Sequence, residues 1–256
     1  MSQQGLLYCR ASDMVVASAT VALTSGTANA AFPLVNLYDL NPAKVFKATG
    51  TSCTITFTYG GAQRWQAFAL ITHNLPGATV TLTNNGGMAS QPITVPSDAE
   101  DGLSVDPFLD LRYVTGNSAT VWTLTITGAS ANVAIGEVVA ASTLRQMPVR
   151  WNLVQGEDIP VRRNRTAYGI SLTYPLGVRS RRLSGTLIHE KFRADLLSLK
   201  RGALGVGRGF LVIPELLVND AWFMRHTDTD NDWTRVNSAH SQMSIALEEV
   251  GRGPGV

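Results

Sequence analysis

The sequence is poor in charged residues. Asp, Glu, Lys and Arg make up 16% of its 256 residues, whereas hydrophobic residues make up 45%. A freely soluble surface usually carries more charge of both signs. The composition therefore favours a protein that packs against neighbours over a monomeric enzyme. The chain is long enough to bury the core of one large β domain or of two modest ones.

Cysteine and histidine are also scarce. Cys9 and Cys53 are the only cysteines, which excludes a disulfide framework and a zinc site with CxxC spacing. We expect each to be a small buried hydrophobe in a strand. A metal site made of three histidines would require distant loops to converge. The sequence therefore predicts no metal site and no cofactor. The four histidines are His73, His189, His226 and His240.

Long apolar runs are missing. None reaches the roughly 18–20 residues that a membrane-spanning helix needs, so no span is predicted. The start, MSQQGLLYCR, lacks a basic region followed by an apolar run, so no signal peptide is predicted either. We expect the protein to be made in a cytoplasm and to stay soluble until it assembles or acts.

The two halves of the chain differ in charge. Residues 1–144 carry five basic and eight acidic side chains, whereas residues 145–256 carry sixteen basic and eleven acidic ones. Fourteen of those sixteen are Arg, whose planar fork suits contacts with carboxylates at interfaces. The change in charge predicts two domains, 1–144 and 145–256, with a boundary near Leu144–Pro148.

The first half follows a β pattern. Cys53–Tyr59 alternates apolar residues with threonine, which predicts a half-buried strand. Gly60-Gly61 is expected to turn the chain into a buried strand over Trp65–Thr72. Further strands are predicted over Met14–Leu23, Ala78–Thr83, Thr120–Ile126 and Val133–Ala140, with turns at Ser25-Gly26, Asn84–Gly87 and Pro96–Asp101. Closely spaced strands without a helical period between them predict a β-sandwich or jelly roll.

The second half is predicted to be a smaller, β-rich α+β domain with one helix. Ala167–Tyr174 is expected to pair with Arg182–Ile188. The helix is predicted over His189–Lys200, where apolar residues recur at helical spacing before Gly202. The remaining strands are predicted over Gly209–Ile213, Ala221–His226 and Met243–Glu249.

Several motifs look like chemistry but have simpler interpretations. The glycines of Gly205–Gly209 follow a helix and lead into a strand, the reverse of a dinucleotide-binding loop, so a turn is predicted. The alternating Asp228, Asp230 and Asp232 lack the Gly and the bidentate Glu of an EF-hand, so a solvated hairpin tip is favoured over a calcium site. HEKFR, from His189, is not the HExxH of zinc proteases.

His73 and Asn74 form a polar tip after a buried strand. His73 could be a catalytic base, but no nucleophile motif such as GxSxG accompanies it. A capping or turn role is favoured, because an Asn side chain at a turn bonds its own backbone, and a ligand at this tip remains the alternative. No catalytic residue is predicted.

Six arginines form two clusters in the second half. Their neighbours do not interleave with aromatic residues, as a nucleic-acid stacking platform would require. They are therefore interpreted as interface residues rather than as a nucleic-acid site. The six are Arg162, Arg163, Arg165, Arg179, Arg181 and Arg182.

Residues 30–140 resemble the galactose-binding-like (discoidin-type) jelly rolls of structural proteins in tailed bacteriophages. The matching segments are Asn36–Asp39, Lys44–Ala48, Thr54–Thr58, Leu70–Leu75, Ala78–Val80 and Ile135–Glu137. The second half is similar at the pattern level to tail-tip components, through YGISL, GFLVIP and SIALEEV. The resemblance implies a virion tail protein, made in the bacterial host, that joins other tail proteins as a homo-oligomeric ring or peg.

Three functions remain open at this point. The first is the structural tail-tip or baseplate role. The second is carbohydrate binding to host surface glycans, which needs exposed aromatics at loop tips; Trp65 and Trp122 lie inside strand patterns. The third is a glycan hydrolase, which needs two carboxylates facing a cleft. The dense acids of the first half, at Glu100, Asp101, Asp106 and Asp110, are expected to decorate a solvated loop, so no enzyme is predicted.

Overall fold

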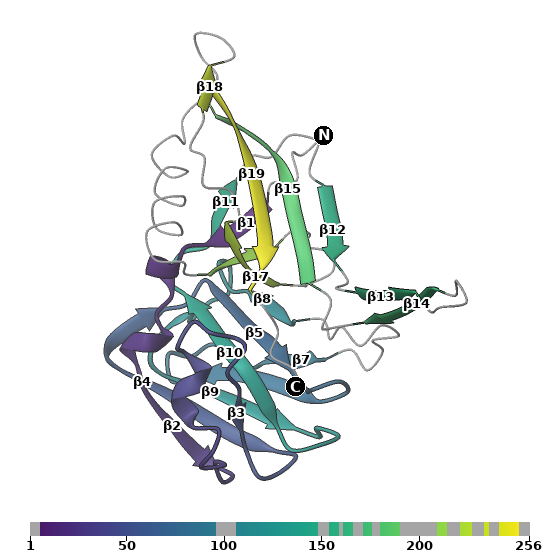
Figure 1. Cartoon of the computed structure of the whole chain (residues 1–256). Helices are drawn as coiled ribbons and strands as arrows, with labels where there is room; N and C mark the ends of the chain where they lie inside the picture. The colour runs from purple at the N-terminus through teal and green to yellow at the C-terminus, as the bar shows by residue number, and fades with distance from the viewer. Residues whose placement is uncertain are drawn as a thin grey trace.

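The computed structural model describes residues 6–95, 106–147, 154–158, 161–165, 171–175, 180–189, 209–213, 221–226, 233–235 and 241–250. Across these residues the chain is mainly antiparallel β-structure (Figure 1). Three short 3-10 helices, η1 (Ala11–Asp13), η2 (Val16–Ser18) and η3 (Leu34–Leu37), are the helical elements in this part of the chain. None of the described helices is long and apolar enough to cross a membrane.

The first half forms a sandwich of two sheets, which confirms the predicted fold class. The five-stranded sheet has the order β2 (Thr20–Ser25), β4 (Cys53–Arg64), β9 (Ser118–Thr127), β6 (Thr79–Asn84), β7 (Gln91–Thr94). The four-stranded sheet has the order β3 (Phe46–Lys47), β10 (Ala134–Ala141), β5 (Ala67–His73), β8 (Phe108–Asp110).

The core between the sheets follows from the period of two in β4 and β9. Phe57 pairs with Trp122 and Ile55 with Leu124, and all four side chains are fully buried. Successive side chains of a strand point to opposite faces, so the threonines between these residues face outward. Trp122, Leu124 and Ile126, which alternate along β9, are all fully buried.

The outer face of the five-stranded sheet is lined with threonine. Thr56 lies opposite Thr123, which in turn lies opposite Thr83. One row along, Thr54, Thr125 and Thr81 repeat the arrangement. Strands β2, β6, β7 and β9 contain no charged residue. The sandwich therefore presents a broad face of hydroxyl and methyl groups, with Arg64 at the end of β4 as the charged residue of this sheet.

A separate sheet of eight strands is built mostly from the second half of the chain. Its order is β11 (Arg145–Met147), β1 (Leu6–Cys9), β16 (Phe210–Ile213), β17 (Trp222–His226), β19 (Ser241–Glu249), β15 (Ser180–His189), β12 (Val154–Asp158), and β18 (Trp233–Arg235) also pairs with β19. Strand β1 comes from the start of the chain and pairs with both β11 and β16. The boundary between 1–144 and 145–256 stays a prediction. Strand β1 belongs to the first of these ranges by sequence, but it pairs with strands of the second.

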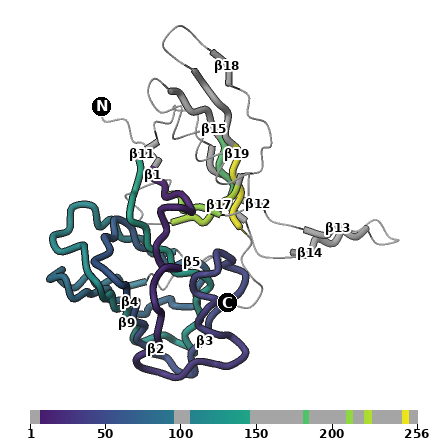
Figure 2. The backbone as a smooth tube through the Cα atoms, turned by 90° about the vertical axis from the view of Figure 1, so that its left-hand side faces the viewer, coloured from purple at the N-terminus to yellow at the C-terminus, as the bar shows by residue number. Residues whose placement is uncertain are grey.

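The two parts pack through a shared apolar layer. Strands β5 and β10 are buried at every position, because one face of each lies in the sandwich core and the other packs against the eight-stranded sheet. Ala69 and Ile71 of β5 belong to the same buried hydrophobic cluster as Leu7, Leu211 and Phe223 of the eight-stranded sheet. The tube view in Figure 2 shows β17 next to the end of the sandwich that holds β5. The four-stranded sheet is thus the middle layer of the molecule.

Four expectations from the sequence are wrong in detail. Within Met14–Leu23, Ser18 Oγ donates to the carbonyl of Val15 at 2.7 Å, and this local bond forms a 3-10 turn before the strand begins at Thr20. Gly60-Gly61 does not turn the chain; it lies within β4, where the pairing with β9 shifts register between Thr58 and Gln63. Glycine tolerates such a bulge inside a strand.

The other two errors concern the second half. Strand β15 pairs with β12 and β19, whereas the described end of the segment Ala167–Tyr174 belongs to β14 (Ser171–Pro175), which pairs with β13 (Val161–Arg165). His189 ends β15, opposite Ser241, and does not begin a helix. The rest of the predicted helix lies outside the described residues. So do the Pro96–Asp101 turn, Gly205–Arg208 and the alternating aspartates near Asp230.

Candidate functional site

One aromatic ring stands out on the surface of the sandwich. Tyr113 has 86% of its surface exposed, and among the described residues the only other large hydrophobic side chain classed as exposed is Val35. A tyrosine ring is amphipathic and rigid, so an exposed one at a loop tip is a common ligand platform. Tyr113 follows β8, in the loop that leads to β9.

The neighbouring residue in the chain is held in a fixed orientation. Arg112 donates from Nε to both carboxylate oxygens of Asp110, at 3.0 and 3.1 Å, and from Nη2 to Oδ2 at 2.6 Å. The backbone N–H of Arg112 also donates to Asp110 Oδ1 at 3.0 Å. This hydrogen-bonded ion pair raises the pKa of Arg112. The guanidinium therefore stays charged and oriented.

Arg112 also sets the position of the tyrosine. Its guanidinium carbon lies 5.3 Å from the centroid of the Tyr113 ring, within the range of a cation–π contact. A ring has two faces, and the guanidinium covers one of them. The other is available to pack against a ligand, beside a fixed group of hydrogen-bond donors.

The loop that carries this pair is anchored at both ends. Leu111 is fully buried and its N–H donates to the carbonyl of Gln66 at 2.9 Å, while its own carbonyl accepts Asn117 Nδ2 at 2.7 Å. Gly116 has φ near +78° and lies so close to Met88 N that a Cβ would clash. Glycine is the residue that adopts this conformation without strain. The site is pre-formed, which lowers the entropic cost of binding.

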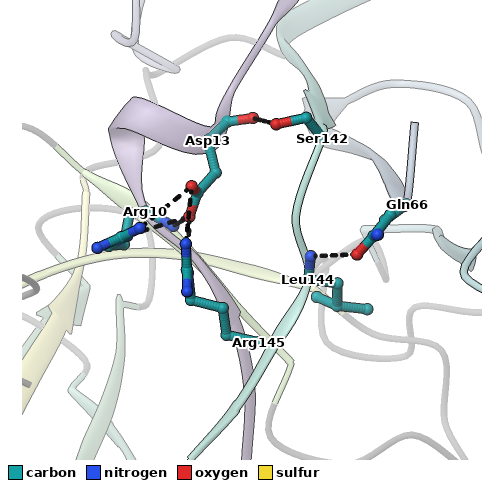
Figure 3. Close-up of polar contacts among 6 residues, drawn as sticks. All are labelled: Arg10, Asp13, Gln66, Ser142, Leu144 and Arg145. Atoms are coloured by element: carbon teal, nitrogen blue, oxygen red, sulfur yellow. Dashed lines mark hydrogen bonds and ion pairs between the residues drawn. The ribbon is translucent and has the colours of Figure 1, made fainter. Parts of the chain in front are cut away.

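A second polar cluster lies where the chain passes between the sandwich and the eight-stranded sheet. Figure 3 shows Asp13 accepting hydrogen bonds from Arg10 and Arg145, and its backbone carbonyl accepting Ser142 Oγ at 3.2 Å. Burial alone would raise the pKa of Asp13, but the hydrogen bonds from the two arginines outweigh it, and the pKa is lowered. The cluster ties β1 and β11 to the sandwich.

The polar tip at His73 and Asn74 proves to be internal to the fold. The Nδ1 atom of buried His73 accepts the N–H of Leu75 at 3.2 Å. Asn74 Nδ2 donates to the carbonyl of Asn132 at 2.8 Å, and its Oδ1 accepts the N–H of Ala134 at 2.7 Å. His73 thus bonds backbone two residues ahead, whereas Asn74 bonds the separate segment Asn132–Ala134 and not the backbone of its own turn. A ligand at this tip stays untested.

Asp106 is where the sequence prediction fails most clearly. It was expected on a solvated loop, but it is fully buried and accepts the N–H of Thr72 at 2.9 Å. His73 Nε2 lies 3.8 Å from its Oδ1, and Arg181 Nη1 of β15 lies 4.0 Å from its Oδ2. Arg181 lies equally far from the carboxylate of Glu249. Charges from both parts of the molecule meet here because a buried carboxylate needs such partners.

Glu137, in the middle layer, is a second buried carboxyl group. Burial, and to a smaller extent the negative charge of Asp39, raise its pKa from 4.5 to about 9. Backbone N–H groups of Leu40 and Asn41 act in the opposite direction. Glu137 is therefore a neutral acid at pH 7. Asp39 itself pairs with Lys44 at 3.2 Å.

The remaining predicted residues are placed as follows. Cys9 and Cys53 are free and buried, as predicted, and burial raises the pKa of both thiols, that of Cys53 to about 11. Arg182 is exposed on β15, whereas Arg181 is buried. Arg162, Arg163 and Arg165 lie on β13, and Arg179 lies outside the described residues, as do Glu100 and Asp101. No group of three or more His, Cys, Asp or Glu in the described ranges could hold a metal ion.

Comparison with known proteins finds likenesses among solved structures. No family model matches the chain, and no curated protein does. The chain is similar to a family 32 carbohydrate-binding module of NanJ from Clostridium perfringens in complex with galactose, at 11% identity, 55% of this chain, 99% of that chain and a TM-score of 0.39. It is similar to a fucose-binding module of Streptococcus pneumoniae, at 9% identity, 50% and 96% coverage and a TM-score of 0.38. It is also similar to a chitosan-binding module from Paenibacillus sp. IK-5, at 14% identity, with 50% of this chain and 98% of that chain covered and a TM-score of 0.37.

Proposed function

We propose that this protein is a non-catalytic carbohydrate-binding protein whose ligand packs on Tyr113. The observation that carries the proposal is the pairing of a highly exposed aromatic ring with a fixed guanidinium on an anchored loop. The C–H groups of a pyranose ring form apolar faces that pack on an aromatic ring. Its hydroxyl groups accept hydrogen bonds from donors at the rim of that ring.

The roles of the three residues differ. Tyr113 supplies the apolar contact area. Arg112 supplies N–H donors beyond those that Asp110 accepts, since a guanidinium carries five. Asp110 holds the guanidinium in place, so that little side-chain entropy is lost when a sugar binds. One aromatic platform buries a small area, and we expect dissociation constants between about 10 µM and 1 mM.

A panel of immobilised glycans probed with the full chain tests this proposal. Wild-type protein should bind at least one class of glycan, and Tyr113→Ala should lose the signal. Val35→Ala, which also truncates an exposed hydrophobic side chain, should bind like wild type. Silence of the wild type across plant, bacterial and animal glycans would count against carbohydrate binding.

Structural assembly in a virion tail is a second candidate, and one observation favours it. The outer face of the five-stranded sheet carries rows of threonine, and four of its strands carry no charge. Soluble surfaces usually intersperse charges, so a sheet face with this little charge suits a surface that is covered in an assembly. Antibody labelling of phage particles tests this role, and the absence of label from the particles would refute it.

A further inference from the structure

The hairpin β13–β14 stands apart from both sheets. Within the described residues its two strands pair only with each other, in register from Val161 opposite Pro175 to Arg165 opposite Ser171. Figure 1 shows the hairpin extending to one side, below β12 and away from the sandwich. A two-stranded hairpin without a covering layer is marginally stable in water. A surface that packs against the hairpin would therefore stabilise it.

The sequence of the hairpin restricts what that surface can be. Its ten residues include three arginines and no acid. Alternation places Arg163 and Arg165 on one face, and Arg162 on the other with the register partner Tyr174. Arginine and tyrosine are the residues most enriched at the centres of protein interfaces. The partner surface should be acidic and should offer hydrogen-bonding groups to an edge strand.

Of the two edges of the eight-stranded sheet in the described residues, one is of that kind. The eight-stranded sheet ends at β11 on one side and at β12 on the other. Strand β11 carries Arg145, which is a mismatch for a basic hairpin. Strand β12 carries Glu157 and Asp158. Exposed strand edges present unpaired N–H and C=O groups that accept another strand.

The hairpin does not use this edge within its own chain. Only two residues separate the end of β12 at Asp158 from the start of β13 at Val161, yet β13 pairs with β14 and not with β12. The chain thus leaves an acidic edge unpaired beside a basic hairpin that is also unpaired, as far as the described residues extend. A second copy of the chain can satisfy both.

We propose that the β13–β14 hairpin of one copy docks on the β12 edge of a second copy, so that the protein self-associates by exchange of this arm. Opposite charges on the two elements set the pairing, and backbone hydrogen bonds at the strand edge supply directional contacts. The inference is independent of carbohydrate binding, since Tyr113 and the hairpin lie on different elements.

Sedimentation analysis of the full chain tests the proposal. Wild type should associate in a concentration-dependent way. Charge reversal on either side, by Arg163→Glu with Arg165→Glu or by Glu157→Lys with Asp158→Lys, should weaken association at least ~10-fold. Combining the two pairs should restore it. The exposed Arg64 at the end of β4 provides a control, and Arg64→Glu should leave the association unchanged.

Two further results would overturn the inference. One is a wild-type protein that stays monomeric up to about 100 µM, the range of weak association. The other is a charge-reversed protein that keeps its mass in solution but loses binding to a polyanion such as heparin, which would assign the arginines to nucleic-acid-like ligands.

Cross-linking gives a readout that does not depend on the stability of the charge variants. Arg163→Cys protein mixed with Asp158→Cys protein should form a disulfide between chains under mild oxidation. The two native cysteines are buried and do not compete. The same mixture with Arg64→Cys in place of Arg163→Cys should not cross-link, and equal yields from both mixtures would contradict the docking.

Discussion

The indole rings of Trp65 and Trp122 stack in the sandwich core, with centroids 4.2 Å apart and planes within 5° of each other. Both rings are fully buried, so neither is available to a ligand. We expect Trp122→Ala to lower the free energy of unfolding by about 3–5 kcal/mol, because it removes a large core side chain and leaves a cavity. Urea denaturation measures this. Val35→Ala, on the surface, should change the value by less than about 0.5 kcal/mol.

Asp106 joins the two parts of the molecule through Thr72, His73 and Arg181. We expect Asp106→Ala to cost about 3–5 kcal/mol in unfolding free energy, since it leaves a buried arginine charge without one of its partners. Asp110→Ala should cost about 1 kcal/mol, because that ion pair is partly exposed. Equal effects of the two substitutions in urea denaturation would contradict the role given to Asp106.

Glu137 should make stability depend on pH. Its pKa is about 9 in the folded protein and about 4.5 in the unfolded chain, so the folded state binds more protons between these values. The contribution of the neutral acid is fully present below pH 4.5 and is lost as the pH rises toward 9. We expect Glu137→Gln to remove this loss, which amounts to about 1.4 kcal/mol per pH unit within the window. Unfolding free energies of wild type and variant that change in parallel from pH 5 to 8 would contradict this role of Glu137.

Asp13 should make the folding stability depend on pH in the opposite direction. Its lowered pKa means that its contribution is present above the unfolded value of 3.8 and is lost as the pH falls through the lower folded value. We expect Asp13→Asn to destabilise the protein by about 1.5–3 kcal/mol at pH 7, because it weakens charged hydrogen bonds from Arg10 and Arg145. Thermal unfolding at pH 7 and pH 3 should show a smaller difference at the lower pH.

The local pattern of the sequence predicted the sandwich well. The alternation in Cys53–Tyr59 and the apolar run at Trp65–Thr72 follow from side-chain direction along a strand, and both correspond to strands of the structure. The pairing of β1 with β16 joins residues about 200 positions apart, and no local pattern encodes it. The pairings of β15 with β12 and with β19 also join separate segments of the chain, and no local pattern encodes them.

The candidate site could not be predicted for a related reason. Tyr113 lies in a segment, LRYVTGN, without a period of two, and its exposure depends on how Leu111 and Gly116 anchor the loop. The Tyr-Arg-Asp grouping was the available signal, since Asp110 and Arg112 are two residues apart. Burial of Asp106 depends equally on contacts with the distant Arg181.

Titration calorimetry with the best-binding glycan tests the central claim most directly. We expect Tyr113→Phe to keep the affinity within about threefold, and Tyr113→Ala and Arg112→Lys each to weaken it at least ~10-fold, because the ring face and the planar guanidinium fork are then lost. Thermal unfolding of the two Tyr113 variants should stay close to wild type, since Tyr113 is exposed. A glycan that binds Tyr113→Ala as tightly as wild type would contradict the proposed site.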